Sequence, residues 1–205
     1  MISTYEQVIP LNQSQKRPAV KVLTRAYSDD ALVNYIIPKA SMKENQLSWY
    51  WGTALHSGLG YGMVFTTPDV NGVAIWSKPG NPKLTILDMF RVGMLTAPFK
   101  LGLASALRAK ASMNYTTKIE KESAPEDHWH LLVLAVDPPC QGKGIGGMLI
   151  QPVLDQADAD GYSCYLETFN ENAVSFYEKH GFEVACITEV PKGGPQFWSM
   201  LRPPH

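Results

Sequence analysis

The sequence feature that most limits the fold of this chain is a glycine-rich turn between two regular elements. Residues 129–136 form a nearly continuous apolar run, as expected of a strand buried on both faces. Residues 137–147 contain four glycines and lead into a helical pattern that continues to Asp160. Such a turn exposes backbone N–H groups at the positive end of a helix dipole, which favours a phosphate or pyrophosphate ligand. Glycine suits the turn because a side chain would block the approach of the phosphate oxygens.

The rest of the pattern predicts an α/β (α+β) protein. Helices are expected at about residues 13–27, 31–37, 41–57, 144–160 and 172–180, from apolar residues at helical spacing. Strands are expected at about residues 5–10, 63–66, 72–76, 129–136, 163–169, 182–190 and 196–201. Turn residues between the second and third strands, Pro68-Asp69 and Asn71-Gly72, predict a hairpin.

Glycine and proline predict where several helices end or bend. The glycines from Gly58 to Gly62 are expected to end the third helix, and Gly181 the last one. Pro152 lies inside the expected helix 144–160 and predicts a kink there, because proline removes a backbone hydrogen bond.

A long helical segment is expected at about residues 83–122, between the third and fourth strands. Pro98 is expected to divide it into two helices. The segment either packs on the sheet or forms a lid over a substrate cavity. The aromatic run Trp49-Tyr50-Trp51 is likewise consistent with core packing or with an apolar acceptor pocket. We expect residues 1–205 to form a single domain.

Composition excludes several classes of function. The net charge is −1 with acids and bases interspersed, so nucleic acid is not an expected partner. The N-terminus lacks a signal-peptide pattern, and no run is apolar enough to span a membrane. Three widely spaced cysteines argue against a disulfide framework and favour a reducing, cytoplasmic location.

The glycine-rich turn can be compared with two other phosphate-binding motifs, the dinucleotide-binding motif and the P-loop. Gly142, Gly144 and Gly147 fit G-x-G-x-x-G, and Glu167 lies where a dinucleotide-binding fold places its ribose-binding acid. However, five residues separate the strand from the first glycine, and too little chain follows Glu167 to build the remaining strand–helix units. A nucleoside-triphosphate P-loop is excluded because the chain has no G-x-x-x-x-G-K-[ST].

The turn resembles the Q/R-x-x-G-x-G/A motif of the GNAT superfamily of acetyl-CoA-dependent N-acetyltransferases. Three further segments are similar to the strands and the helix that accompany this motif in the family. The four segments that carry the resemblance are residues 130–138, 141–146, 166–168 and 172–182. Within the family, Gln151-Pro152, residues 157–161 and Tyr165-Leu166-Glu167-Thr168 are similar to the puromycin N-acetyltransferase-like branch.

The resemblance implies a fold and a bound co-substrate. The expected fold is a twisted, mostly antiparallel sheet of six to seven strands flanked by helices, in which strands four and five splay apart. Acetyl-CoA would lie in the splay, its pantetheine arm on the backbone of strand four and its pyrophosphate on the turn. The cofactor-binding residues implied are Leu134, Ala135, Val136, Gln141, Gly142, Lys143, Gly144, Ile145, Gly146, Thr168, Asn172, Phe176 and Tyr177.

The resemblance also implies direct acetyl transfer to an amine. Tyr177 matches the family's tyrosine that protonates the leaving thiolate, although its apolar neighbours at helical spacing would also explain it as a packing residue. His130 lies where some family members have a histidine base, and the ordinary pKa of imidazole suits proton transfer near neutral pH. Glu122, Asp127 and Glu167 are the alternative bases.

Metal and thiol chemistry are not expected. His128 and His130 point to one face of the strand, but the sequence offers no obvious third ligand for zinc. Cys140 lies beside the turn without any partner for a nucleophilic role.

The sequence therefore predicts an N-acetyltransferase that acts on a small-molecule amine. The alternatives left open are a protein that binds coenzyme A without turnover and an enzyme that acts on proteins. A homodimer is also left open.

Overall fold

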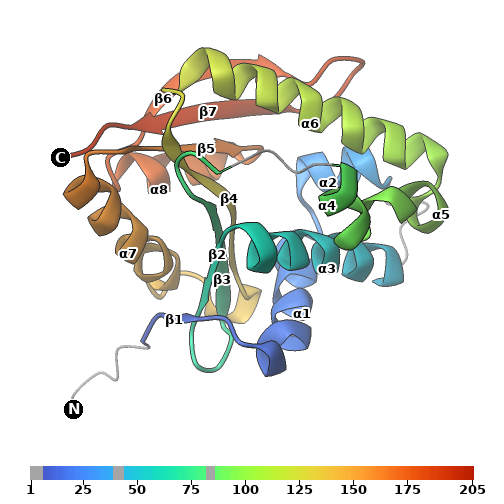
Figure 1. Ribbon diagram of the computed structural model, residues 1–205, viewed down its shortest axis with the longest axis horizontal. Helices are drawn as coiled ribbons and strands as arrows, with labels where there is room; N and C mark the ends of the chain where they lie inside the picture. Colours follow the sequence, from blue (N-terminus) through green and yellow to red (C-terminus); the bar gives the residue numbers. More distant parts are fainter. Residues whose placement is uncertain (1–6, 39–43, 82–85) are drawn as a thin grey trace.

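The computed structural model describes residues 7–38, 44–81 and 86–205, and it is built on a seven-stranded sheet (Figure 1). The strand order is β1-β2-β3-β4-β5-β7-β6, and every neighbouring pair is antiparallel except β4 and β5. The strands are β1 (Ile9–Pro10), β2 (Met63–Thr66), β3 (Gly72–Ser77), β4 (His128–Val136), β5 (Ser163–Thr168), β6 (Glu183–Glu189) and β7 (Gln196–Arg202). This arrangement confirms the expected fold class and the β2–β3 hairpin.

Helices cover both faces of the sheet. They are α1 (Lys16–Ala26), α2 (Ala31–Ile36), α3 (Glu44–Tyr61), α4 (Ile86–Arg91), α5 (Ala97–Leu101), α6 (Leu103–Ser123), α7 (Ile145–Asp160) and α8 (Val174–Glu178). Short 3-10 turns occupy Gln13–Gln15, Met94–Thr96, Pro138–Cys140 and Glu171–Ala173. None of the helices in the described ranges is long and apolar enough to cross a membrane.

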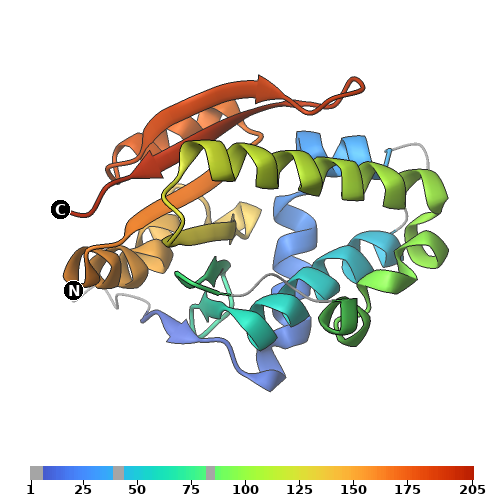
Figure 2. The same ribbon diagram turned by 45° about the horizontal axis from the view of Figure 1, so that its top comes forward.

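Two main cores lie on opposite faces of the sheet. One packs α1, α2 and α3 against residues of β2, β3 and β4, and the other packs α7 and α8 against β3, β4, β5 and β7. A third, smaller cluster holds α6 on the sheet, with Ile119 against Val190 and Phe197. Figures 1 and 2 show α6 extending beside β6 and β7, away from α7.

Strands β4 and β5 run together for only four residue pairs and then separate. The parallel ladder begins at His128 and Ser163 and ends at Leu131 and Leu166. Beyond this point β4 continues its pairing with β3 as far as Val136, and β5 continues with β7 as far as Thr168. The sheet therefore opens between the carboxyl ends of β4 and β5, as the sequence resemblance implies.

A β-bulge at Leu132 changes the faces of β4. Ile75 pairs with Val133 and Trp76 with Leu131, so Leu132 has no partner on β3 and is half exposed, at 51%. Successive side chains of a strand point to opposite faces of the sheet, and the extra residue in a bulge shifts this alternation by one. Leu131 therefore packs with the α7 core, whereas Val133 packs with the α1–α3 core. The bulge thus lies directly at the position where β4 leaves β5.

Two expected helix boundaries are corrected by the structure. Pro98 does not divide the segment between β3 and β4, because it lies in the first turn of α5, where its missing N–H breaks no helical bond. The breaks fall at Gly93 and Gly102, whose φ angles of 83° and 89° are accessible to glycine. Helix α3 continues through Gly58 and Gly60 to Tyr61.

The other boundaries agree more closely with expectation. The expected helix 172–180 is a 3-10 turn followed by the five-residue helix α8. Helix α7 continues past Pro152, which is exposed. The first residues of the expected strand 5–10, of the helix 41–57 and of the segment 83–122 lie outside the described residues.

A partly buried ion pair joins α7 to β7. The Arg202 guanidinium donates two hydrogen bonds to the Asp158 carboxylate, at 2.6 and 2.7 Å, and its Nε donates to the His180 carbonyl at 3.1 Å. These bonds from Arg202 lower the pKa of Asp158 to about 2. The interaction fastens the end of α7, and the chain after α8, to the last strand.

We predict that Asp158→Asn lowers the free energy of unfolding by about 2 kcal/mol, because it removes the charge that Arg202 contacts. The folded-state pKa of Asp158 is depressed, so the stabilisation is present above its ordinary value and is lost as pH falls toward 2. Thermal melts should therefore show a smaller difference from wild type at pH 3 than at pH 7. Asp160→Asn, at an exposed position of the same helix, is the control. Equal effects of the two substitutions on stability would show that the Asp158–Arg202 ion pair does not stabilise the fold.

Candidate active site

The opening between β4 and β5 exposes backbone groups of β4. The Asp137 N–H donates to the Asn71 carbonyl at 2.8 Å, and bonded and non-bonded pairs alternate along an antiparallel ladder. Leu134 and Val136 therefore turn their N–H and C=O groups away from β3, toward the opening. Two contacts agree with this orientation, because the Leu134 carbonyl accepts from the Tyr27 hydroxyl at 2.9 Å and the Val136 carbonyl from Gln141 Nε2 at 3.1 Å.

Ala135 is placed differently from its two neighbours in the expected binding set. It pairs with Val73, and the same alternation directs its backbone N–H and C=O groups to β3. Its side chain is buried in the α1–α3 core. Hydrogen bonds to a ligand in the opening are therefore expected from Leu134 and Val136.

The glycine-rich turn brings an uncovered stretch of backbone to the same edge. Gly142 and Gly144 have φ angles of 75° and 81°, which side chains rarely tolerate, and Gly144 is the residue before α7. Residues 141–144 are exposed, whereas Ile145 is buried and fixes the first turn of α7 in the core. The backbone N–H groups at the start of a 16-residue helix thus face outward beside the opening.

Two side chains of the turn fold back on the turn itself. Lys143 Nζ donates to the Pro139 carbonyl at 3.1 Å, and Gln141 bridges to Val136 as described above. These contacts stabilise the loop from within, because they satisfy carbonyl groups that β3 does not reach. The positive charge of Lys143 remains at the exposed rim of the turn.

Close packing of α8 on α7 depends on two further glycines. A Cβ on Gly146 would lie 3.3 Å from Cζ of Phe176, and one on Gly147 would lie 2.8 Å from Nε2 of His180. The side chain of Phe176 in turn stacks on His180 and contacts Tyr177 edge to face. The glycines thus let α8, which carries Tyr177, pack closely on α7.

Tyr177 and Tyr27 belong to the cores on opposite faces of the sheet and are close enough to interact electrostatically. Tyr177 belongs to the α7–α8 core and is 8% exposed, whereas Tyr27 packs on the α1–α3 core. Burial raises the pKa of Tyr177, so the phenol is protonated at neutral pH. Burial is also the main reason that the pKa of Tyr27 is raised, and the nearby Tyr177 raises it further. Both phenols are therefore neutral at neutral pH, and the Tyr27 hydroxyl contacts Leu134 directly.

An aromatic cluster with one carboxylate adjoins Tyr27. The Tyr27 ring lies 4.5 Å from the Trp51 ring, and Tyr50 meets Trp51 edge to face at 5.0 Å. Asp30 caps α2 by accepting from the Val33 N–H at 2.9 Å. Burial raises the pKa of both Tyr27 and Tyr50, and the charge of Asp30 raises it further. Burial also raises the pKa of Asp30 itself.

A histidine–glutamate network lies where β4 and β5 separate. His130 Nε2 is 2.7 Å from the Glu167 carboxylate, and His130 Nδ1 faces Glu120 of α6 at 3.6 Å. Burial alone would lower the pKa of His130, but the two carboxylates outweigh it and raise the pKa to about 10. With this pKa, His130 is an imidazolium at neutral pH. A general base must be unprotonated to accept a proton, so this arrangement does not favour His130 as the base. Its Nε2 is hydrogen-bonded to Glu167, and its Nδ1 faces Glu120 at the longer distance.

The remaining residues of the expected set lie around the turn. The Thr168 hydroxyl accepts from the Asn170 N–H at 3.3 Å, and Asn170 rather than Asn172 caps the 3-10 turn that follows. Asn172 is exposed. Cys140 is a free, half-buried thiol in the part of the chain that the structure describes.

Two of the alternative bases are not brought into the network. Asp127 is exposed, and Glu122 forms an exposed ion pair with Lys118 at 3.7 Å. Glu167 is brought into the network, through the hydrogen bond to His130.

The structure adds residues that sequence reasoning did not select. Tyr27 and Asp30 reach the site from the end of α1 and the start of α2, and Glu120 reaches it from the last turn of α6. Arg25 also reaches the turn, where its guanidinium contacts both oxygens of Asp137 at 2.8 and 2.6 Å. Asp30 carries a helix-capping signal, but the others have no local signal, because their partners are distant in sequence.

The family model described as the acetyltransferase (GNAT) family matches residues 102–182. An uncharacterized N-acetyltransferase of Schizosaccharomyces pombe is 24% identical over 172 residues, which are 81% of this chain and 70% of the relative. A peptidyl-lysine N-acetyltransferase of Salmonella typhimurium is 37% identical over 68 residues, which are 33% of this chain and 46% of that relative.

Solved acetyltransferase structures share the fold over nearly the whole chain. A histone acetyltransferase and related acetyltransferase of Corynebacterium glutamicum superposes with a TM-score of 0.73 at 20% identity, covering 98% of this chain and 97% of that one. Arylalkylamine N-acetyltransferase 2 of Aedes aegypti gives 0.66 at 13% identity, with 98% and 100% covered. The polyamine N-acetyltransferase of Drosophila melanogaster gives 0.60 at 13%, with 96% and 98% covered.

We predict that Tyr27→Phe lowers the free energy of unfolding by about 1 kcal/mol, because it leaves the Leu134 carbonyl without its donor. Urea denaturation measures the change. Tyr35→Phe is the matched control, since the hydrogen bond of the Tyr35 hydroxyl to the Pro191 carbonyl is long, at 3.4 Å, and exposed. If the two variants have the same free energy of unfolding, the hydrogen bond from Tyr27 does not stabilise β4 at the opening.

Proposed function

We propose that this chain, which belongs to the acetyltransferase (GNAT) family and is an acyltransferase, transfers the acetyl group of acetyl-CoA to a primary amine of a small molecule. The observation that carries the proposal is the opening between β4 and β5, where the backbone N–H groups of Leu134 and Val136 turn away from β3 beside the glycine-rich turn. An extended ligand with an anionic end fits such an edge, because strand-like hydrogen bonds and helix N–H groups meet there.

Coenzyme A would occupy this edge along its length. The pantetheine amides would bond to Leu134 and Val136, and the pyrophosphate would bond to the N–H groups of residues 141–146. Lys143 at the rim would add positive charge near the phosphates, and the side chains of Phe176 and Tyr177 would contact the arm from α8. Thr168, at the end of β5, and Asn172, in the turn before α8, would border the arm from the other side.

The chemistry proposed is direct attack of a neutral amine on the thioester carbonyl. Holding both reactants in one opening supplies the proximity that such an attack needs. The Val136 N–H would stabilise the oxyanion that develops on the carbonyl. As the tetrahedral intermediate collapses, the thiolate leaves and the phenol of Tyr177 gives it a proton.

Tyr177 suits the acid role because its buried phenol holds a proton at neutral pH. Tyr27, whose hydroxyl donates to the Leu134 carbonyl, would position the strand beside it.

We assign proton removal from the amine to the His130–Glu167 pair, acting through Glu167. Both ring nitrogens of His130 face carboxylates, so its geometry suits the orientation of Glu167 better than direct acceptance of a proton. Glu167 follows the last β4–β5 pair and therefore lies at the inner end of the opening. A carboxylate there can accept the amine proton directly or through one water molecule.

The acceptor-side group of Asp30, Tyr27, Tyr50 and Trp51 supports an amine substrate. A carboxylate beside aromatic rings attracts an ammonium group by charge and by cation–π contact. Structural neighbours include enzymes described as arylalkylamine and polyamine N-acetyltransferases, which carry the same fold. We therefore propose an amine with an apolar or aromatic body as the acceptor class.

The direct test is release of free thiol from acetyl-CoA against a panel of arylalkylamines, polyamines and lysine peptides. Tyr177→Phe should lower kcat by about 100-fold or more if the phenol protonates the thiolate. Tyr162→Phe, at an exposed position, is the control and should keep full activity. An unchanged kcat in Tyr177→Phe would remove Tyr177 from the mechanism. Tight acetyl-CoA binding without thiol release on any amine would favour a coenzyme-A-binding protein without turnover.

A second test addresses the acceptor. Asp30→Asn should raise the KM for the amine by about tenfold with little change in kcat, because it removes a charge that binds ground state and transition state alike. Asparagine keeps the oxygen that caps α2, so the fold is expected to persist. Asp30→Ser, which also retains a cap, should behave in the same way. If both variants keep the wild-type KM, Asp30 does not contact the amine.

A further inference from the structure

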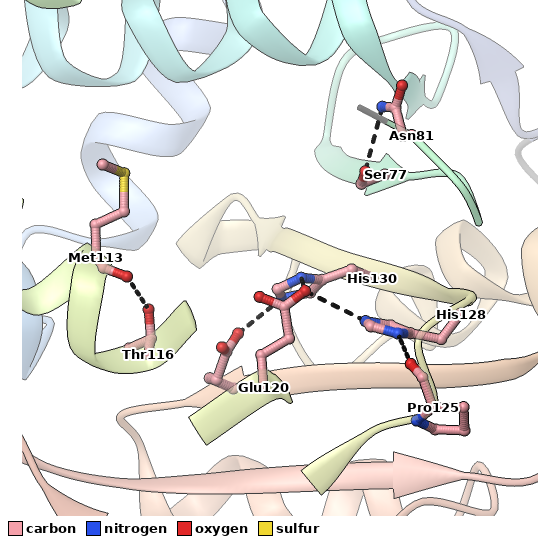
Figure 3. Close-up of polar contacts among 9 residues, drawn as sticks. Ser77, Asn81, Met113, Thr116, Glu120, Pro125, His128 and His130 are labelled. Atoms are coloured by element: carbon pink, nitrogen blue, oxygen red, sulfur yellow. Dashed lines mark hydrogen bonds and ion pairs between the residues drawn. The ribbon is translucent and has the colours of Figure 1, made fainter. Parts of the chain in front are cut away.

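Three side chains from α6 and β4 converge behind the active site. We call Glu120, His128 and His130 the HHE cluster. Their potential ligand atoms all lie within 4.8 Å of one another. The exposed fractions of the three side chains are 26%, 9% and 12%, so the cluster is largely shielded from solvent. Figure 3 shows the two imidazole rings and the Glu120 carboxylate turned toward one another.

Each histidine of the HHE cluster is oriented by an acceptor on its outer side. His128 Nδ1 lies 2.6 Å from the Pro125 carbonyl, which can only accept, so this nitrogen carries the hydrogen. His130 Nε2 lies 2.7 Å from the Glu167 carboxylate, which acts in the same way. The inner nitrogens, His128 Nε2 and His130 Nδ1, both face Glu120. A bound cation would replace the proton that His130 Nδ1 carries in its absence, because a histidine ligates through a deprotonated nitrogen. Acceptors on the outer nitrogens are the usual support of metal-binding imidazoles in proteins.

The inner distances are long for hydrogen bonds and suit a shared cation. His128 Nε2 and His130 Nδ1 lie 3.4 and 3.6 Å from the same oxygen of Glu120, Oε1. Charge-assisted N–H···O bonds are usually about 2.7–2.9 Å long. Ligand atoms about 2.1 Å from a tetrahedral ion are about 3.4 Å apart, which matches both separations.

We propose that the HHE cluster binds a divalent cation, with Zn²⁺ as the preferred ion. Two imidazoles and one carboxylate form a ligand set typical of zinc, and harder ions such as Mg²⁺ prefer oxygen ligands. The fourth position would be held by water. The sequence alone shows only the two histidines, because Glu120 becomes a neighbour through the packing of α6 on the sheet.

A bound ion would tie the inserted helices to the active site. Glu120 lies in the last turn of α6, whereas both histidines are on β4. His130 contacts Glu167 at the point where β4 and β5 separate. The cation would therefore fix α6 against β4 and hold Glu167 through His130. This inference goes beyond acetyl transfer, and its test needs no acetyl-CoA.

The test uses the untagged full chain after removal of metals with a chelator. Titration with zinc sulfate followed by calorimetry should give one site per chain, and elemental analysis after dialysis should find about one zinc. Saturating zinc should raise the Tm by about 5–10 °C, as expected for a ligand that binds only the folded state at about 100 times its Kd. Cobalt(II) should give the visible absorption of a tetrahedral site.

Glu120→Gln and His128→Gln should each weaken zinc binding by at least tenfold and abolish the rise in Tm. His56→Gln and Glu122→Gln, at exposed positions, are the matched controls and should bind as the wild type does. Circular dichroism of the metal-free variants separates loss of the site from loss of the fold. The proposal is overturned if folded wild-type protein takes up no zinc, or if the cluster variants bind zinc as tightly as the controls.

Discussion

The end of the parallel ladder between β4 and β5 is the constraint on which the site depends. Four residue pairs hold the two strands together, and each then follows a different antiparallel partner. In a continuous sheet, the backbone groups of β4 beyond Leu131 would bond to β5. Because the strands separate, these groups face the opening, where a ligand can reach them. The bulge at Leu132 lies at the same position and lets β4 contribute to both cores while it turns away from β5. The site is therefore a consequence of sheet geometry before any catalytic side chain is considered.

The proposed site draws on groups from both faces of the sheet. The glycine-rich turn, α7 and α8 supply the backbone proposed to bind phosphate, and Tyr177, from one side. From the other side, α1 and α2 bring Tyr27 and Asp30, and α6 brings Glu120 to the histidines of β4. In our proposal, co-substrate binding and acceptor binding are built by different parts of the chain.

Sequence predicted the half of the site that is local. Residues 129–160 contain the apolar strand, the glycines with left-handed backbone angles and the helix that follows them. The position of the turn can therefore be predicted from the sequence pattern alone. The acceptor half depends on tertiary contacts. Tyr27 and Leu134 are 107 residues apart, and no periodicity predicts their hydrogen bond. Pro98 shows a different limit. Proline is acceptable in the first turn of a helix and disruptive in the middle of one, and the sequence pattern does not distinguish the two positions.

The central claim is that the opening between β4 and β5 holds acetyl-CoA, and a crystal structure of the complex tests it most directly. Our account predicts the pantetheine arm along the backbone of Leu134 and Val136. It predicts the pyrophosphate on the N–H groups of residues 141–146, with the thioester near Tyr177. Electron density for acetyl-CoA anywhere else on the protein, with the opening filled by side chains, would contradict the account.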